Sequence, residues 1–186
     1  RRASMSEIAE AAGISRPTLY QWFDNKETLF RQLANHRQNQ AIEAARAALA
    51  GDAPVAGRIC RAILAYERIF YEPVAGSPHG AELMDVDLGA AKQDMAAGRN
   101  RLEGALAAAI EEAATHGEIR LSGPAMEARQ FVGLLMLSIS GLKKAAGDIE
   151  AFRRMIADVT AIFMGSVGAS PADRGSAGEA QAGRTG

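Results

Sequence analysis

A short segment near the N-terminus gathers long polar and aromatic side chains, which are unusual on a helix surface unless they contact another molecule. An arginine can donate two parallel hydrogen bonds to guanine, and a threonine methyl can contact the methyl of thymine. A tyrosine hydroxyl or a glutamine amide can reach a phosphate or a base edge. The segment therefore favours contact with nucleic acid. The residues concerned are Arg16, Thr18, Tyr20, Gln21 and Trp22.

Two short helices joined by a tight turn are predicted to position this segment. Ser4 and Glu7 form a capping-box pair ahead of an apolar face, so a first helix is expected from Met5 to Ala12. Gly13 then ends this helix, because glycine readily adopts the positive φ that a helix C-terminus often requires.

A second helix is predicted directly after the turn. Ser15 is its expected N-cap, Pro17 lies in its first turn, where a missing N–H does no harm, and the helix ends near Phe23. Ser4 to Phe23 therefore form a helix-turn-helix pattern, in which the second helix presents its N-terminal end to the major groove of DNA. Hairpins of two helices around a glycine also occur without any DNA contact, and this alternative stays open.

Lys26 lies in the first turn of a third predicted helix, which Asp24 or Asn25 caps. Free backbone N–H groups and the helix dipole favour a phosphate at such a place, and a lysine adds a positive charge. The alternative interpretations are that Lys26 is simply solvated and that Tyr20 and Trp22 pack against the helix that follows them.

The rest of the chain is helical by its pattern, without period-two alternation and without an internal repeat. The expected fold class is all-α, with an N-terminal helix-turn-helix domain over 1–50 and a larger helical domain over 51–168. Further helices are predicted over 26–49, 55–71, 87–116, 125–146 and 149–167, with a loop at 73–80 and a disordered tail at 169–186.

Composition and charge narrow the function classes. The 186 residues carry a net charge of −1, but residues 1–50 hold seven Lys/Arg against five Asp/Glu, which suits a part that approaches a polyanion. A single cysteine, Cys60, excludes an internal disulfide and a cysteine-based zinc site, and we expect it to be a small buried residue rather than a redox sensor. No apolar run is long enough to span a membrane. The three histidines are scattered, so we expect no enzyme activity, no metal and no cofactor.

Three short runs in residues 4–30 match a known family in order and spacing. They are Ile8-Ala-x-x-Ala-Gly-Ile-Ser15, Thr18-Leu-Tyr20 and Phe23-x-Asn-Lys-Glu-x-Leu-Phe30. This part closely resembles the DNA-binding domain of TetR/AcrR-type bacterial transcriptional regulators. The resemblance implies DNA contacts by Ser15, Arg16, Pro17, Thr18, Tyr20, Gln21 and Lys26, with Ser15 also acting as the cap, and Trp22 is added from its own chemistry.

The resemblance also implies a function and a location. The expected protein is a sequence-specific, homodimeric repressor of bacterial transcription that a small hydrophobic or amphipathic effector releases from a palindromic operator in double-stranded DNA. It would be cytoplasmic and nucleoid-associated, without membrane contact. Family members begin with one more helix, before the helix that starts here at Ser4. We therefore expect weak DNA binding from a piece without it, while Arg1 and Arg2 either contact the DNA backbone or are solvated.

Each of the last two predicted helices carries an apolar stripe, and the stripe of the first has more apolar surface than one neighbour can cover. The resemblance implies that this helix pair joins its counterpart from a second copy in a four-helix bundle, although part of each stripe must be core within one chain. The predicted interface residues are Leu134, Ser138, Ile139, Leu142, Phe152, Met155, Val159, Ile162 and Phe163.

An effector pocket is expected among the middle helices, again from the resemblance, which implies that ligand entry moves the two DNA-binding heads apart. The candidate lining residues are Arg61, Tyr66, Phe70, Met84, Met95, Phe131 and Leu135, with His79 and His116 as further polar anchors. Methionines and aromatics at helical spacing are more often plain core than the wall of a pocket.

Two other function classes remain open. One is an effector-independent DNA-binding or architectural protein whose helical body serves only dimerisation or protein recruitment, and absence of a cavity would favour it. The other is a helical enzyme or carrier, which the lack of any catalytic constellation disfavours.

Overall fold

The computed structural model describes residues 4–75, 92–121 and 126–168, and helices are the only regular secondary structure in these ranges. This confirms the all-α fold class. None of the described helices is long and apolar enough to cross a membrane. The helices are α1 (Met5–Ala11), α2 (Arg16–Trp22), α3 (Lys26–Leu49), α4 (Val55–Ala75), α6 (Lys92–Thr115), α7 (Ala128–Ala145) and α8 (Ile149–Ser166).

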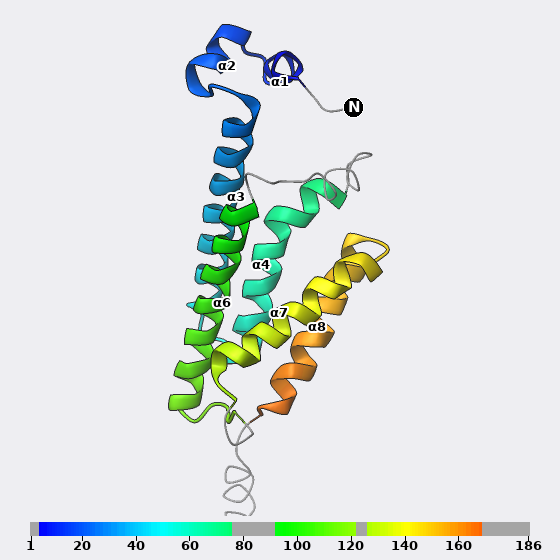
Figure 1. Cartoon of the computed structure of the whole chain (residues 1–186). Coiled ribbons are helices and arrows are strands. Elements are labelled where there is room, and N and C mark those ends of the chain that lie inside the picture. Colours follow the sequence, from blue (N-terminus) through cyan, green and yellow to red (C-terminus); the bar gives the residue numbers. More distant parts are fainter. Residues whose placement is uncertain (1–3, 76–91, 122–125, 169–186) are drawn as a thin grey trace, which may run out of the picture.

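The long helix α3 connects a small N-terminal head to the rest of the protein. Figure 1 shows α1 and α2 at one end of α3, with α4 and α6 beside its remaining length and α7 and α8 packed on those two helices. Leu29, in the first turn of α3, packs on the apolar cluster of the head, whereas Ala41, Ile42 and Ala45 belong to the main core. Its 24 residues span about 36 Å, so α3 belongs to both parts.

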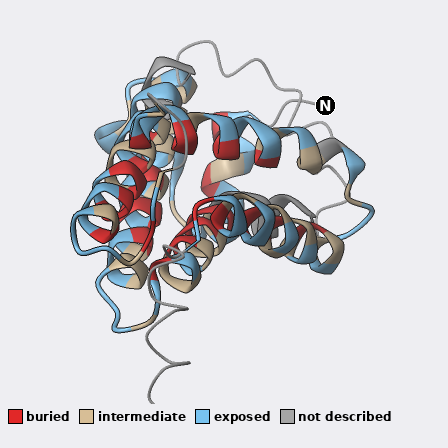
Figure 2. Ribbon diagram, turned by 90° about the horizontal axis from the view of Figure 1, so that it is seen from below, coloured by how far each residue is buried: buried red, intermediate tan, exposed pale blue. Residues whose placement is uncertain are grey.

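The main core lies between α3, α4, α6, α7 and α8, which we call the body. α3 packs on α4 and α6, α7 packs on α6, and α8 packs on α4 and α7. Figure 2 shows the buried faces of these helices turned toward one another. The core is aliphatic: the largest fully buried side chains include Ile59, Ile63, Leu102, Leu106 and Ile110.

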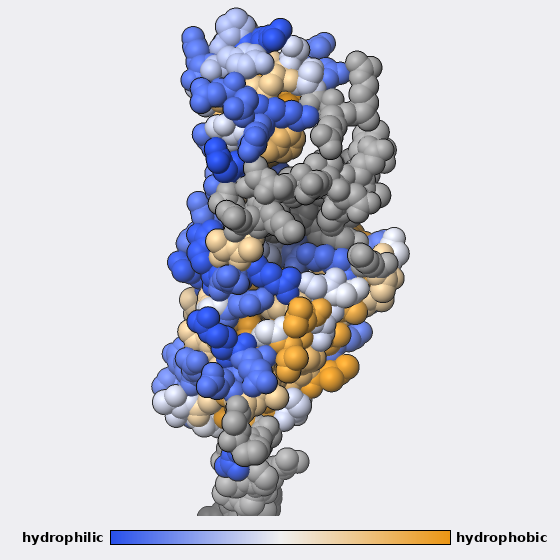
Figure 3. Space-filling view, viewed as in Figure 1, coloured by the Kyte–Doolittle hydropathy of each residue, from blue (hydrophilic) through white to orange (hydrophobic). Residues whose placement is uncertain are grey.

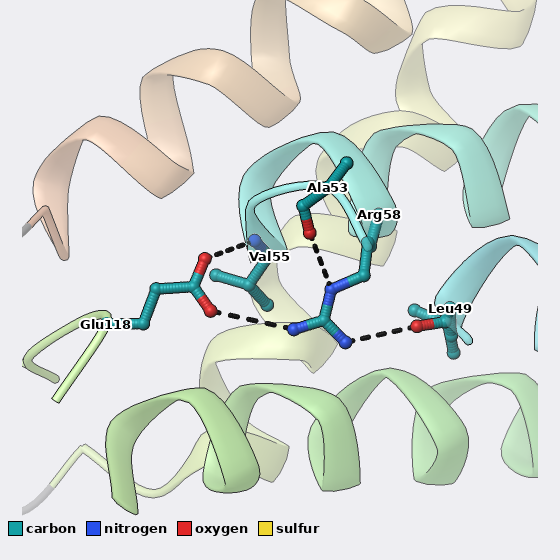
Figure 4. Close-up of polar contacts among 5 residues, drawn as sticks. All are labelled: Leu49, Ala53, Val55, Arg58 and Glu118. Carbon is teal, nitrogen blue, oxygen red and sulfur yellow. Dashed lines mark hydrogen bonds and ion pairs between the residues drawn. The ribbon is translucent and has the colours of Figure 1, made fainter. Parts of the chain in front are cut away.

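One polar cluster fixes the end of the body that is remote from the head (Figure 4). The Glu118 carboxylate accepts a hydrogen bond from the free N–H of Val55 at the start of α4 and lies 3.6 Å from Arg58 Nη2. Arg58 donates in turn to the carbonyls of Ala53 and Leu49, at 3.0 and 3.1 Å. The cluster satisfies backbone groups at the end of α3 and the start of α4, which otherwise lack partners in their own helices.

The predicted helix bounds hold closely except in α4. Asp148 caps α8 as expected, and Asn25, not Asp24, caps α3. The prediction that the helix from Val55 ends near Tyr71 is wrong, because α4 continues to Ala75 with Pro73 inside it. Proline leaves the carbonyl of Ile69, four residues earlier, without its helical donor. Arg37 Nη1 on α3 donates to this carbonyl at 3.1 Å.

Two expectations lie wholly or partly outside the described residues. The first is the start, at 87–91, of the predicted helix that is described from Lys92 as α6. The second is the predicted disordered tail at 169–186.

Candidate nucleic-acid interface

Helix α1 begins with a complete capping box. The Ser4 backbone N–H donates to Glu7 Oε2 at 2.7 Å, and the Ser4 hydroxyl accepts from the Glu7 N–H at 3.2 Å. The hydrogen bond from the Ser4 backbone is the largest cause of a lowered pKa for Glu7. Gly13, with φ at +68°, ends the helix, and the N–H of Ile14 donates to the carbonyl of Ala9. The sequence-based prediction of this cap and this turn is confirmed.

Helix α2 begins at the cap that the sequence predicts. The Ser15 side chain accepts from the Thr18 N–H at 3.2 Å, and the hydroxyls of Ser15 and Thr18 lie 2.7 Å apart. Pro17 lies in the first turn, where it breaks no hydrogen bond. The Thr18 hydroxyl is therefore held against its own helix cap.

A small apolar cluster holds α2 against α1. Its buried members are Met5, Ala9 and Leu19, one residue from the start of α1, one from its middle and one from α2. Leu19 is the one buried residue of α2. Residues that are partly buried around the cluster are Ile8, Ile14, Phe23 and Leu29. Every other side chain of α2 therefore remains at least partly accessible.

The polar and aromatic side chains of α2 lie on its accessible surface. Trp22 is 61% exposed and Tyr20 is 39% exposed, and Arg16 and Gln21 are likewise exposed. The alternative that Trp22 packs against the following helix is wrong for the described residues. The Arg16 guanidinium lies over the Tyr20 ring, 5.5 Å from the ring centroid. The helix thus presents a cation and two aromatic rings and carries no acidic residue.

Lys26 lies at the first position of α3, directly after the Asn25 cap. The Asn25 side chain accepts from the Thr28 N–H at 2.8 Å. Lys26 is half-buried and its Nζ lies 5.4 Å from the centroid of the Phe30 ring. A cation at the start of a 24-residue helix adds to the positive end of the helix dipole, an arrangement that favours a phosphate.

The residues predicted for a dimer interface divide between the core and the surface. Ile139 and Phe152 are buried in the core of the single chain, so including these two was wrong. Leu134 and Ile162 are exposed at 44% and 71%, and Ser138 is also exposed, its hydroxyl donating to the Leu134 carbonyl. The half-buried members are Leu142, Met155, Val159 and Phe163.

Sequence reasoning missed one residue of this surface, Leu137, which is 66% exposed. It follows Leu134 by one helical turn, and this spacing could have placed both residues on one stripe. Figure 3 shows the resulting apolar patch over α7 and α8. Exposed leucine and isoleucine gathered in this way mark an interaction surface more often than a solvated one.

The described residues of the predicted pocket divide between the main core and the surface. Tyr66, Phe131 and Leu135 are buried in the main core, where the Phe131 ring meets that of Phe163 edge to face at 5.7 Å between centroids. Arg61 is exposed. The side chains of Phe70, Met84, Met95 and His79 lie outside the described residues.

His116 and Cys60 are the further residues singled out in the sequence that fall in the part of the chain that the structure describes. His116 is exposed in the turn after α6, and Cys60 is half-buried with its pKa raised by burial. The described residues contain no group of three His, Cys, Asp or Glu side chains able to hold a metal ion.

Solved structures with a similar fold are bacterial regulators. PfmR, a TetR family transcriptional regulator from Thermus thermophilus, is 18% identical with a TM-score of 0.59, over 87% of each chain. A putative TetR-family regulator from Mesorhizobium loti is 20% identical with a TM-score of 0.62, over 89% of this chain and 87% of that chain. One from Rhodococcus sp. is 19% identical with a TM-score of 0.62, over 87% and 88%. At these identities the likeness concerns the fold.

Sequence comparison points to the same family through the head. The family model of bacterial regulatory proteins of the tetR family matches residues 1–33. No curated protein matches the chain at a significant level. The matched segment contains the capped α1, the Gly13 turn and the exposed α2, and the fold of the described body is that of the solved regulators. The family match therefore concerns the head, where residues 1–33 resemble the tetR family, and the likeness to the solved TetR-family regulators concerns the fold of the described residues.

Proposed function

We propose that the chain is a homodimeric repressor that binds a palindromic operator and leaves it when a small hydrophobic or amphipathic effector binds the body. Residues 1–50 would form the DNA-binding domain and 51–168 the effector-binding and dimerisation domain of a cytoplasmic, nucleoid-associated protein. The observation that carries the DNA-reading part is the surface of α2: Leu19 alone is buried, while Arg16, Tyr20, Gln21 and Trp22 face outward.

Dimerisation is supported by the apolar patch on α7 and α8. Leu137 and Ile162 are mostly exposed, and Leu134 is close to half exposed. Ser138 lies on the same stripe as the two leucines. Burying such side chains against a second copy removes apolar area from water, at about 25 cal/mol per Å². A two-fold dimer presents two α2 helices, so its operator would be an inverted repeat with half-sites about one DNA turn apart or a multiple of it.

Selection of bound duplexes from a random pool tests the DNA-reading part. We expect the full chain to enrich an inverted repeat, because two identical heads contact two identical half-sites. Arg16→Ala should relax the preference at defined base pairs. Arg46→Ala is the matched control, because Arg46 is an exposed arginine near the far end of α3, paired with Glu43 at 3.6 Å. Failure of a folded chain to bind any duplex would contradict the proposal.

Light scattering during size-exclusion chromatography tests the dimer. Leu137→Glu and Ile162→Glu should each convert the dimer to monomer, since a charge would enter the centre of an apolar interface. Both side chains are mostly exposed in the single chain, so its folding should change little. Leu33→Glu on α3 is the matched control, as Leu33 is 46% exposed and lies away from α7 and α8. A dimer that survives both substitutions would exclude this surface.

The effector requires a separate measurement. A panel of amphipathic and aromatic small molecules can be screened for release of the selected duplex, measured by fluorescence anisotropy of labelled DNA. Release that depends on the compound concentration, together with a raised melting temperature of the free protein, would support the effector-responsive repressor. Sequence-blind binding that no compound relieves would favour the alternative, an effector-independent DNA-binding protein.

A further inference from the structure

On the exposed surface of α2, the side chains of Arg16 and Tyr20 contact each other. Arg16 and Tyr20 are four residues apart, one turn of the helix, and the guanidinium lies 5.5 Å from the ring centroid. Both side chains are exposed, so the contact does not result from burial in the core.

We propose that Tyr20 is a positioning residue for Arg16, and that its ring, rather than its hydroxyl, sets the base preference of the arginine. This inference rests on the proposed function, since it presupposes that α2 enters the major groove. A guanidinium stacked on an aromatic face keeps its N–H edge available for two parallel hydrogen bonds in its own plane. Stacking also restricts the arginine side chain before it binds, so less conformational entropy is lost on binding.

The neighbouring side chains leave this pair as the main candidate for a rigid base contact. The Thr18 hydroxyl lies 2.7 Å from the Ser15 hydroxyl at the helix cap, and Pro17 has no side-chain donor. Gln21 is long and exposed. Arg16, at the first position of α2, also lies at the end of a recognition helix that usually contacts base edges.

Substitutions that separate the ring from the hydroxyl test the inference. The full chain first selects an inverted-repeat duplex, and binding to this duplex and to its single-base-pair variants is then measured by anisotropy. Tyr20→Phe keeps the ring and should leave the base preference unchanged. Tyr20→Leu removes the ring and should reduce the preference at the Arg16-dependent base pair by about two- to fivefold per half-site. Circular dichroism checks that each variant remains helical.

A double-substitution cycle tests the dependence on Arg16. In an Arg16→Ala background the effect of Tyr20→Leu on base preference should vanish, because no guanidinium remains to be positioned. Arg16→Ala itself should lower the preference at one base pair of each half-site about tenfold or more and leave the other positions unchanged.

Each contrary outcome has a distinct meaning. Equal losses for Tyr20→Phe and Tyr20→Leu would overturn the inference, since the hydroxyl would then be the contact. A uniform loss over all duplexes for Arg16→Ala, with a shallower salt dependence, would overturn it by placing Arg16 on a phosphate. In both cases the proposed function would stand. Absence of any enriched inverted repeat for the unaltered protein would instead refute the proposed function and the inference with it.

Discussion

Adding a methyl group at Gly98 should destabilise the protein, although glycine in a helix is normally a weak point. In α6, an alanine at this position would place its Cβ on the side-chain amide of Gln38 from α3. Gln38 is fully buried and its Oε1 accepts a hydrogen bond from the Tyr66 hydroxyl at 3.1 Å. The amide would have to move out of a packed interior and away from this partner.

The expected magnitude follows from two opposing terms. Replacing glycine by alanine in a helix interior raises the free energy of unfolding by about 1 kcal/mol, because alanine has the higher helix propensity. Displacing the Gln38 amide loses a net hydrogen bond with Tyr66 and leaves buried polar groups unsatisfied, at a cost of about 2–3 kcal/mol. We therefore expect Gly98→Ala to lower the free energy of unfolding by roughly 1–2 kcal/mol. In a Gln38→Ala background the overlap is absent, and the same change should stabilise by about 1 kcal/mol.

Urea denaturation measures these free energies, and the protein concentration is held fixed because the stability of the proposed dimer would depend on it. Gly104→Ala in the same helix is the matched control, since an added Cβ there has no neighbour within 4 Å. It should stabilise by about 1 kcal/mol in either background. If Gly98→Ala stabilised the protein as much as Gly104→Ala does, the packing of Gln38 against α6 would be refuted.

Three further predictions concern single contacts of the body. Arg37→Met removes the donor to the Ile69 carbonyl and should lower the free energy of unfolding by about 1–3 kcal/mol, measured by thermal denaturation. Adding Pro73→Ala restores a backbone N–H for this carbonyl and should recover most of the lost stability. No recovery would refute this role of Arg37. Thr160→Val should stabilise by about 1 kcal/mol, because the buried Thr160 hydroxyl has no hydrogen-bond partner among the described residues; destabilisation would indicate one. Burial raises the pKa of Tyr66, so the neutral Tyr66 side chain should stabilise the fold below pH 10, and this stabilisation should be lost as the pH rises through the folded-state pKa. Absorbance at 295 nm follows the ionisation, and Tyr66→Phe is the control that should lack this pH dependence.

The head could be predicted from sequence because its signals are local. The capping box of Ser4 and Glu7, the positive φ of Gly13 and the Ser15 cap each involve residues at most a few positions apart. Such signals fix where α1 and α2 begin and end without knowledge of the rest of the fold. The stacking of Arg16 on Tyr20 is also local, at four residues, but periodicity alone does not distinguish it from two independent solvated side chains.

The division of the α7 and α8 stripes between core and surface could not be predicted in the same way. Ile139 and Leu134 are both apolar residues of one helix, yet the first is fully buried and the second is 44% exposed. What separates them is the direction from which α6 and α8 approach α7, and this direction is a property of the assembled body. An apolar stripe predicts that a helix is covered, but it does not say how much of the cover comes from its own chain.

The end of α4 could not be predicted for a different reason: the local sequence at Pro73 predicts that the helix ends, but a residue distant in the sequence allows it to continue. Proline inside a helix leaves one carbonyl unsatisfied, which normally ends the helix nearby. Arg37 removes this cost from 32 positions away, by donating to the Ile69 carbonyl, and it does so from α3, the helix that carries the head. The last turns of α4 and the middle of α3 are therefore tied by a charged hydrogen bond, and next to it the buried Gln38 bonds to Tyr66. Among the described residues, α3 contributes to both the apolar cluster of the head and the main core, so a change in α4 at this level acts on the helix that positions α2.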